Sequence, residues 1–145
     1  MIIKNVLILG GTGAMGRPLQ EILIKKGFDV SVTSRSQHES ANVTYLQGDA
    51  HDTEFLKRIL SSKNFCTVVD FMTYSSAEFE NIVDIILPNT NQYIFMSSAR
   101  VYAESESLIT EKSPRILDVC SDETYLKTDE YALKKAREED VLIAK

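Results

Sequence analysis

The chain has 145 residues, a length typical of one compact domain with a core of its own. Hydrophobic residues make up 43% and charged residues 26%, which excludes a disordered, fibrous or disulfide-rich chain. The formal net charge is -5 and the Lys and Arg residues are scattered, so nucleic acid is not an expected partner, because its binding relies on clustered basic charge.

Short β-branched apolar runs alternate with helical stretches along the chain. The runs predict strands over residues 5–10, 29–34, 44–47, 66–71 and 92–97. The first run is too short for a signal peptide or a membrane span. Helical spacing predicts helices over 13–26, 53–62 and 77–87, with Asp52 capping the second and Ser75 with Glu78 forming a capping box for the third. This alternation predicts parallel strands covered on both faces, with the first strand near the centre.

The segment 99–127 lacks clear periodicity but retains apolar residues, and we expect an ordered functional loop there. Thr128, Asp129 and Glu130 then predict the start of a last helix, because acidic groups complement the positive end of the helix dipole. The sequence therefore predicts one α/β domain over residues 1–145, a doubly wound parallel sheet of the Rossmann type. Cys66 and Cys120 show no metal-ligand spacing, so we expect reduced thiols in the cytoplasm and no metal.

The most informative segment follows the first strand and opens the first helix; it consists of Gly10, Gly11, Thr12, Gly13, Ala14, Met15 and Gly16. Gly10 permits a tight turn, Gly13 lets a pyrophosphate approach the backbone, and Gly16 lets the helix pack closely on the sheet. Free N–H groups and the helix dipole then hold the anion. A glycine-rich turn without a ligand is the alternative, but the strand before it and the helix after it favour nucleotide binding.

The end of the second strand indicates which dinucleotide binds. Ser34, Arg35 and Ser36 stand where an NAD-selective site has an acidic residue, and a guanidinium can pair with a 2′-phosphate, so NADP is favoured over NAD. The alternative for Arg35 is a solvated charge at a strand end. Asp49 is placed to accept a hydrogen bond from the adenine amino group, or else it is a turn or capping residue. His38 and His51 are interpreted as surface or cap residues.

Tyr131 and Lys135 are four residues apart on the last helix, so their side chains emerge on one face. A tyrosine with an ordinary pKa of about 10 carries protons poorly at neutral pH. An ammonium about 4 Å away could favour the phenolate by up to ~4 kcal/mol at an effective dielectric of about 20. Such pairs are common on helices, and the order along the chain is more specific: the glycine turn, then Ser98, then Tyr131 with Lys135.

With Gly48-Asp49 and with Ser98 ahead of Val101-Tyr102, these motifs make the chain similar to the extended short-chain dehydrogenase/reductase family, which includes NAD-dependent epimerases and dehydratases. The local pattern resembles its nucleoside-diphosphate-sugar epimerase-like branch. The resemblance implies that Ser98 hydrogen-bonds the reacting oxygen, that Tyr131 exchanges its proton, and that Lys135 binds the nicotinamide ribose and lowers the pKa of the tyrosine. It also implies that Ala50, Phe71 and Met72 lie beside the cofactor, with Met72 narrowing a wall that small residues often line.

The resemblance implies an oxidoreductase or epimerase that passes hydride between a cofactor and a carbinol carbon of a nucleotide sugar or similar polar substrate. The alternative is a non-catalytic NAD(P)-binding sensor or regulator. In the family, later strands and a C-terminal substrate region follow, so we expect a chain truncated before them. Leu133, Val141 and Leu142 fit either a homodimer interface or packing on those strands.

Overall fold

The computed structural model describes residues 4–145, which fall into two compact units. The first unit contains residues 4–73 and 81–96, and the second contains residues 74–80 and 97–145. Each unit is described by itself below. No helix within residues 4–145 has the length and apolar character that crossing a membrane requires.

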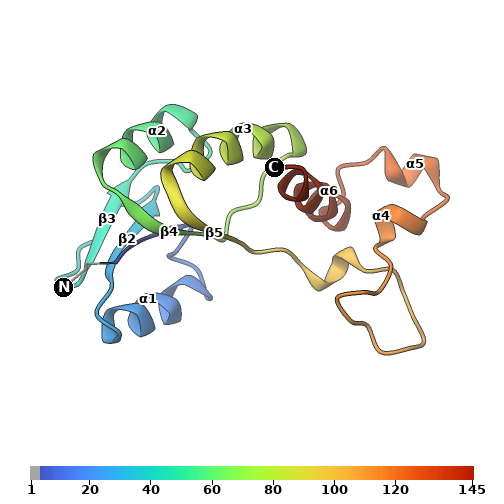
Figure 1. The fold of residues 1–145 in the computed structure, drawn as a ribbon, viewed down its shortest axis with the longest axis horizontal. Coiled ribbons are helices and arrows are strands. Elements are labelled where there is room, and N and C mark those ends of the chain that lie inside the picture. Colours follow the sequence, from blue (N-terminus) through green and yellow to red (C-terminus); the bar gives the residue numbers. More distant parts are fainter. Residues whose placement is uncertain (1–3) are drawn as a thin grey trace. The chain divides into compact units, whose positions relative to one another are not determined.

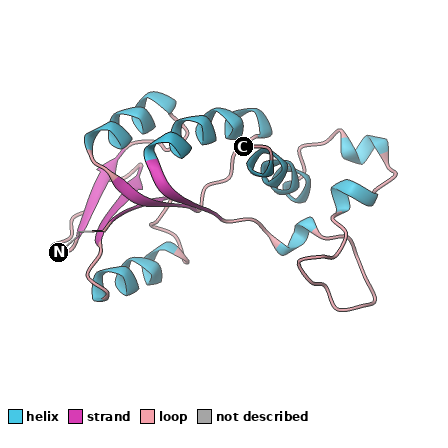
Figure 2. Ribbon diagram, in the orientation of Figure 1, coloured by secondary structure: helices cyan, strands magenta, loops and turns pink. Residues whose placement is uncertain are grey.

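The first unit is built on a parallel sheet of five strands (Figures 1 and 2). The strands are β1 (Asn5–Leu9), β2 (Asp29–Ser34), β3 (Val43–Gln47), β4 (Phe65–Asp70) and β5 (Thr90–Phe95). Their order is β3-β2-β1-β4-β5, so β1 lies at the centre. The predicted doubly wound sheet is therefore confirmed, with strand bounds displaced by no more than a few residues.

Helices cover both faces of this sheet. Figure 1 shows α1 (Gly16–Lys25) on one face, and α2 (Thr53–Ser62) and α3 (Ser76–Ile86) on the other. A short 3₁₀ helix, Leu87–Asn89, leads from α3 into β5. The expected start of the first helix at residue 13 is wrong, because the glycine turn continues to Met15. Asp52 caps α2, and Ser75 with Glu78 forms the capping box of α3, as expected.

The core follows the alternation of side chains along the two central strands. Val6 and Ile8 of β1 pack with Val30 and Val32 of β2 and with apolar residues of α1. The strand β5 departs from the expectation that every strand is covered on both faces. Its Ile94 is 40% exposed and lines an apolar groove on the face of the sheet, and β5 is one of the two edge strands among those that the structure describes, the other being β3.

The second unit contains the segment 99–127, for which the sequence predicts an ordered functional loop. It includes a 3₁₀ turn η2 (Ala99–Val101), the short helices α4 (Ile116–Val119) and α5 (Glu123–Leu126), and the longer α6 (Tyr131–Ile143). The last helix begins three residues later than expected from Thr128, because the Glu130 side chain accepts a hydrogen bond from the Ala132 N–H and so marks the N-cap.

Arg115 fastens the irregular segment to α6. Its guanidinium pairs with Asp118 at 2.9 Å, with Glu139 at 3.2 Å and with Asp140 at 2.7 Å. It also donates to the Ala136 carbonyl. The hydrogen bond to Asp118 leads the causes that raise the pKa of Arg115, and the same contact lowers the pKa of the Asp118 carboxyl. The ion pairs and hydrogen bonds of the Arg115 side chain therefore hold this irregular segment against α6, in place of the regular backbone hydrogen bonds of a helix or a strand.

We expect Asp52→Ala to lower the free energy of unfolding by about 1 kcal/mol, the usual effect of losing an N-cap. The Asp52 carboxylate accepts from the N–H groups of Glu54 at 2.9 Å and Phe55 at 3.3 Å, and alanine leaves both without that acceptor. Urea unfolding followed by circular dichroism measures the change. Asp52→Ser is the control, since serine caps helices well, and an equal loss in both variants would contradict the capping role.

Candidate functional site

The first two residues of the glycine turn between β1 and α1, Gly10 and Gly11, are each held by a hydrogen bond to a side chain outside the turn. Gly10 has a φ of 69°, a conformation that favours glycine, and its N–H donates to the Thr33 hydroxyl at 3.2 Å. The Gly11 carbonyl accepts from the buried Gln20 amide at 2.6 Å, and the Tyr45 hydroxyl donates to the same Gln20. The turn is therefore held in one shape by α1, β2 and β3.

The start of α1 is open to an anion. Its N-cap residue, Met15, makes no side-chain hydrogen bond to the first turn, in contrast to Asp52 at α2. Gly13 is exposed, and the contact nearest to a Cβ placed on it would be the Gly10 carbonyl oxygen at 3.9 Å. Backbone N–H groups at a helix N-terminus attract negative charge. The turn therefore leaves the space that a phosphate needs.

A pocket of about 220 Å³ opens beside this turn, at the carboxyl ends of the strands. Seven of the ten lining residues are ones that sequence analysis assigned to the cofactor: Gly10, Thr12, Ser34, Arg35, Asp49, Ala50 and Met72. The other three, Thr33, Gly48 and His51, were not assigned. His51 follows Asp49 by two residues, but this spacing does not show that the histidine lines the pocket. The pocket gathers residues from four separate loops because parallel strands end at one edge of the sheet.

Arg35 and Asp49 present opposite charges in this pocket, and both are exposed. The Asp49 carboxylate accepts from the His51 N–H at 3.0 Å, so it forms the turn that sequence analysis gave as its alternative role. One carboxylate oxygen of Asp49 accepts this hydrogen bond. The hydrogen bond from the adenine amino group to Asp49 stays a prediction. The Arg35 carbonyl accepts from the Gln47 side chain at 3.4 Å, and Arg35 is one of the residues that line the pocket.

Met72 lines one side of this pocket, and its backbone is held in place by a buried carboxylate. Asp70 is fully buried and accepts from the Met72 N–H at 2.8 Å and from the Tyr93 hydroxyl at 2.7 Å. A Cβ placed on Gly10 would come within 2.8 Å of the Met72 sulfur, so this side chain packs directly on the glycine turn. Met72 thus lines the pocket and packs against Gly10, and the narrowing of a cofactor wall by this side chain stays a prediction.

Other residues assigned to the cofactor lie outside this pocket. Gly11 and Gly16 are buried in the turn, Ala14 is exposed on it, and the Ser36 N–H donates to the Ser34 hydroxyl. Met15 and Phe71 line a separate apolar groove of about 420 Å³ on the face of the sheet that α1 covers.

The catalytic candidates Ser98, Tyr131 and Lys135 all belong to the second unit. Ser98 precedes η2, which packs against α6, and its hydroxyl accepts from the Arg100 N–H at 3.2 Å. Next to it, the Ser97 hydroxyl donates to Glu139 of α6 at 2.5 Å. The segment that carries Ser98 is thus attached to the helix that carries Tyr131.

Arg100 lies over Tyr131, a contact that the sequence did not indicate. The guanidinium carbon is 5.7 Å from the centre of the tyrosine ring, and the tyrosine is 36% exposed. The guanidinium also pairs with Glu130 at 2.7 Å. Arg100 follows Ser98 by two residues, but this spacing does not show that its side chain meets the tyrosine ring. A cation therefore lies close to the candidate proton carrier.

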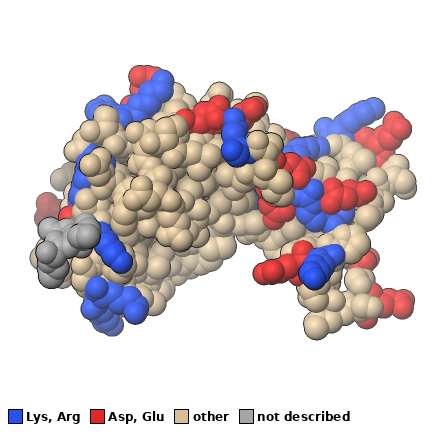
Figure 3. All heavy atoms as spheres, in the orientation of Figure 1, with Lys and Arg blue, Asp and Glu red and all other residues tan. Residues whose placement is uncertain are grey.

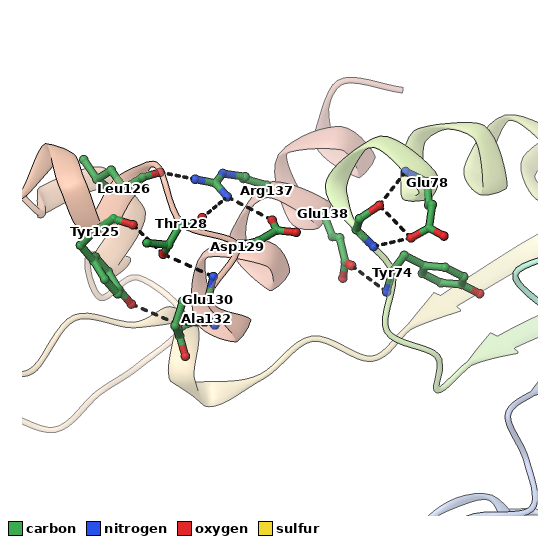
Figure 4. Close-up of polar contacts among 11 residues, drawn as sticks. Tyr74, Glu78, Tyr125, Leu126, Thr128, Asp129, Glu130, Ala132, Arg137 and Glu138 are labelled. Atoms are coloured by element: carbon green, nitrogen blue, oxygen red, sulfur yellow. Dashed lines mark hydrogen bonds and ion pairs between the residues drawn. The ribbon is translucent and has the colours of Figure 1, made fainter.

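Glu130 holds this arrangement together (Figure 4). It caps α6 through the Ala132 N–H at 2.7 Å and accepts from the Tyr125 hydroxyl at 3.0 Å. The Ala132 hydrogen bond is the main cause that lowers the pKa of Glu130, while burial raises the pKa of Tyr125. The first turn of α6, which begins with Tyr131, is thus fixed by a carboxylate that favours its charged form.

Lys135 occupies a different environment from Tyr131, although both lie on α6. Lys135 is buried, and its ammonium pairs with the Glu138 carboxylate at 2.9 Å. The expected action of Lys135 on the tyrosine stays a prediction.

We expect Gly16→Ala to destabilise the protein by about 2 kcal/mol or more, and Gly13→Ala by less than about 0.5 kcal/mol. A Cβ on Gly16 would lie 2.1 Å from the Gly11 carbonyl oxygen, whereas Gly13 has room for one. Thermal unfolding of both variants tests this difference. Equal melting temperatures would contradict the close packing of Gly16 on the turn.

The chain is similar in sequence to several curated proteins. The chain is 34% identical over 121 residues to the chloroplast stem-loop binding protein of 41 kDa b of Arabidopsis thaliana, covering 72% of this chain and 32% of that protein. It is 28% identical over 133 residues to UDP-glucose 4-epimerase of Lactobacillus helveticus, covering 76% of this chain and 40% of that protein. The chain therefore spans well under half the length of these curated relatives.

Solved structures share the fold. The enzyme WbmH of Bordetella bronchiseptica, in complex with NAD+, superposes with a TM-score of 0.77 at 17% identity, covering 99% of this chain and 53% of that one. UDP-glucose 4-epimerase of Bifidobacterium longum, in complex with NAD+ and UDP, gives a TM-score of 0.75 at 22% identity, covering 97% of this chain and 48% of that one. The predicted resemblance to epimerases is confirmed. The NmrA-like family model matches residues 3–109, and the chain belongs to that family.

Proposed function

We propose that this chain supplies the nucleotide-binding and catalytic part of an NAD(P)-dependent epimerase, dehydratase or reductase. The observation that carries the proposal is the open glycine turn beside a pocket lined by Arg35 and Asp49. Downstream in the chain, Ser98 and the pair Tyr131 and Lys135 follow in the order that hydride-transfer enzymes of this type use.

The residues present fit a dinucleotide. The uncapped start of α1 and the open space at Gly13 suit the pyrophosphate, and the pocket beside Arg35 suits the adenosine half. An exposed guanidinium at the end of β2 favours NADP, because it can form paired hydrogen bonds to a 2′-phosphate. The solved structures of WbmH and of the Bifidobacterium longum epimerase contain NAD+. In this proposal, Arg35 is the residue that shifts the preference of this chain from NAD to NADP.

The nicotinamide ring, when bound, accepts or returns the hydride of the substrate carbon. Tyr131 takes the proton of the substrate hydroxyl as the carbonyl forms, and returns it in the reverse direction. Ser98 accepts a hydrogen bond from the Arg100 N–H, and its own hydroxyl proton stays available to the substrate oxygen. Lys135 holds the nicotinamide ribose. The three residues with these roles, Ser98, Tyr131 and Lys135, all belong to the second unit.

The substrate that we propose is a nucleotide sugar or a similar polar alcohol. Curated relatives from Lactobacillus helveticus and Neisseria meningitidis are UDP-glucose 4-epimerases, and the Bifidobacterium longum structure contains UDP. The proposal extends to a cytoplasmic homodimer in which residues 1–145 form the cofactor domain. Cys66 and Cys120 are free thiols, which suits a reducing compartment.

Calorimetry tests the cofactor assignment. We expect Arg35→Ala to weaken NADPH binding by about tenfold or more and to leave NADH binding unchanged, because the lost hydrogen bonds go to the 2′-phosphate. We expect Gly13→Val to weaken both. Arg58→Ala is the control, since Arg58 lies on α2 over the Phe55 ring. Equal losses for NADPH and NADH in Arg35→Ala would contradict the 2′-phosphate role.

A second variant separates an enzyme from the alternative, a non-catalytic sensor. We expect Tyr131→Phe to bind NADPH like the unmodified chain and to lower turnover by about 10²–10⁴-fold, the usual contribution of a positioned acid–base group. Turnover is measured as epimerisation of UDP-glucose, with UDP-galactose as the detected product. Unchanged turnover would remove Tyr131 from the chemistry, and a chain that binds the cofactor and also converts the substrate would exclude the sensor.

The stem-loop binding relative makes a nucleic-acid role the second candidate, because it shares 34% identity with this chain. Charge argues against that role here. The net charge is -5, and Lys and Arg are interspersed with Asp and Glu on the face that Figure 3 shows. Fluorescence anisotropy with a labelled RNA stem-loop at physiological salt distinguishes the two candidates.

A further inference from the structure

The helix α6 carries a buried ion pair that the proposed chemistry leaves unexplained. The side chain of Lys135 is 2% exposed and that of Glu138 is 0% exposed, with the ammonium nitrogen 2.9 Å from the carboxylate oxygen. Replacing such a pair by apolar residues of similar volume is often neutral or stabilising, because both charges must leave water. Stability alone therefore does not account for a charged pair at this place.

Glu138 is held from a second direction. Its other carboxylate oxygen accepts from the Tyr74 N–H at 3.4 Å, as Figure 4 shows. Tyr74 is 1% exposed, and its ring packs on Phe79 with the centroids 5.7 Å apart. Ser75 and Glu78 then fix the first turn of α3. The carboxylate is thus clamped between α6 and the segment that leads into α3.

A clamped acceptor orients the ammonium that it binds. The ammonium has three N–H donors on a flexible four-carbon side chain. An acceptor fixed on one side determines where the nitrogen lies and where the remaining donors point. Glu138 follows Lys135 by three residues, the spacing that brings two side chains together on a helix. The adjacent Lys134 is not buried in this way.

We propose that Glu138 is a positioning residue for Lys135, which it holds in the place where the ammonium binds the nicotinamide ribose. The inference rests on the proposed cofactor role of Lys135. Glu138 itself does not touch the cofactor in this account, and it acts only through the ammonium. Its loss should therefore weaken binding of the whole dinucleotide and spare binding of a ligand that lacks the nicotinamide ribose.

The test compares NADPH with ADP, which carries the adenosine and the pyrophosphate but lacks both the nicotinamide ribose and the 2′-phosphate, so each variant is compared with the unmodified chain for each ligand separately. We expect Glu138→Gln to weaken NADPH binding by about tenfold, because the amide has no charge to pair with the ammonium, and to leave ADP binding within twofold. Glu138→Asp keeps the charge and should recover part of the NADPH affinity. Asp140→Asn is the control, because it neutralises another carboxylate of α6 that pairs with Arg115 instead.

A double-mutant cycle asks whether Glu138 acts through Lys135. In Lys135→Met the ammonium is absent, so adding Glu138→Gln should change the ratio of NADPH to ADP affinity by less than twofold. The double variant also removes both buried charges. If Glu138→Gln alone does not fold, the double variant is the folded reference, and the affinities of Glu138→Asp for NADPH and ADP are compared with those of the unmodified chain.

Unchanged NADPH affinity in folded Glu138→Gln would overturn the inference, as would equal weakening of NADPH and ADP, or an effect that persists in the Lys135→Met background. These results leave the proposed function standing as long as the unmodified chain binds NADPH. An unmodified, folded chain that binds neither NADPH nor ADP would overturn the proposed function and this inference together.

Discussion

The close approach of Gly16 to the backbone of Gly11 is the constraint on which the nucleotide-binding unit depends. A Cβ at position 16 would lie 2.1 Å from the Gly11 carbonyl oxygen, so only hydrogen fits there. This contact lets α1 start directly against the end of β1. The first helical N–H groups therefore face the carboxyl edge of the sheet, where the pocket with Arg35 and Asp49 opens.

The turn depends in addition on polar contacts that reach well beyond it. The Gln20 amide binds the Gly11 carbonyl, and Tyr45 on β3 binds Gln20, so three elements support one peptide group. His38, interpreted from sequence as a surface or cap residue, packs on the Tyr45 ring with centroids 4.9 Å apart. The loop after β2, which carries Arg35, is thereby connected to the turn that would hold the pyrophosphate.

The second unit is organised by charged residues around α6 rather than by a sheet. Arg115 ties the irregular segment to the middle of the helix, and Glu130 fixes its first turn and the guanidinium of Arg100. Glu138 pairs with Lys135 in the interior. Ion pairs that share hydrogen bonds with the backbone have defined geometry, which suits side chains that must meet a substrate in one orientation.

The sequence by itself determined the strands, their parallel pairing with the first strand near the centre, the caps at Asp52 and at Ser75 with Glu78, and the glycine turn, because these follow from periodicity and local hydrogen bonding along the chain. It also predicted most of the residues that line the pocket beside the turn, since the ends of parallel strands meet at one edge. The tertiary structure alone decided that His51 joins this pocket, that Arg100 lies over Tyr131 and that Glu138 is the buried partner of Lys135. An arginine or a glutamate has the same local preference whether it is solvated or paired. Only the packing of separate segments decides which charge it meets and how far both are removed from water.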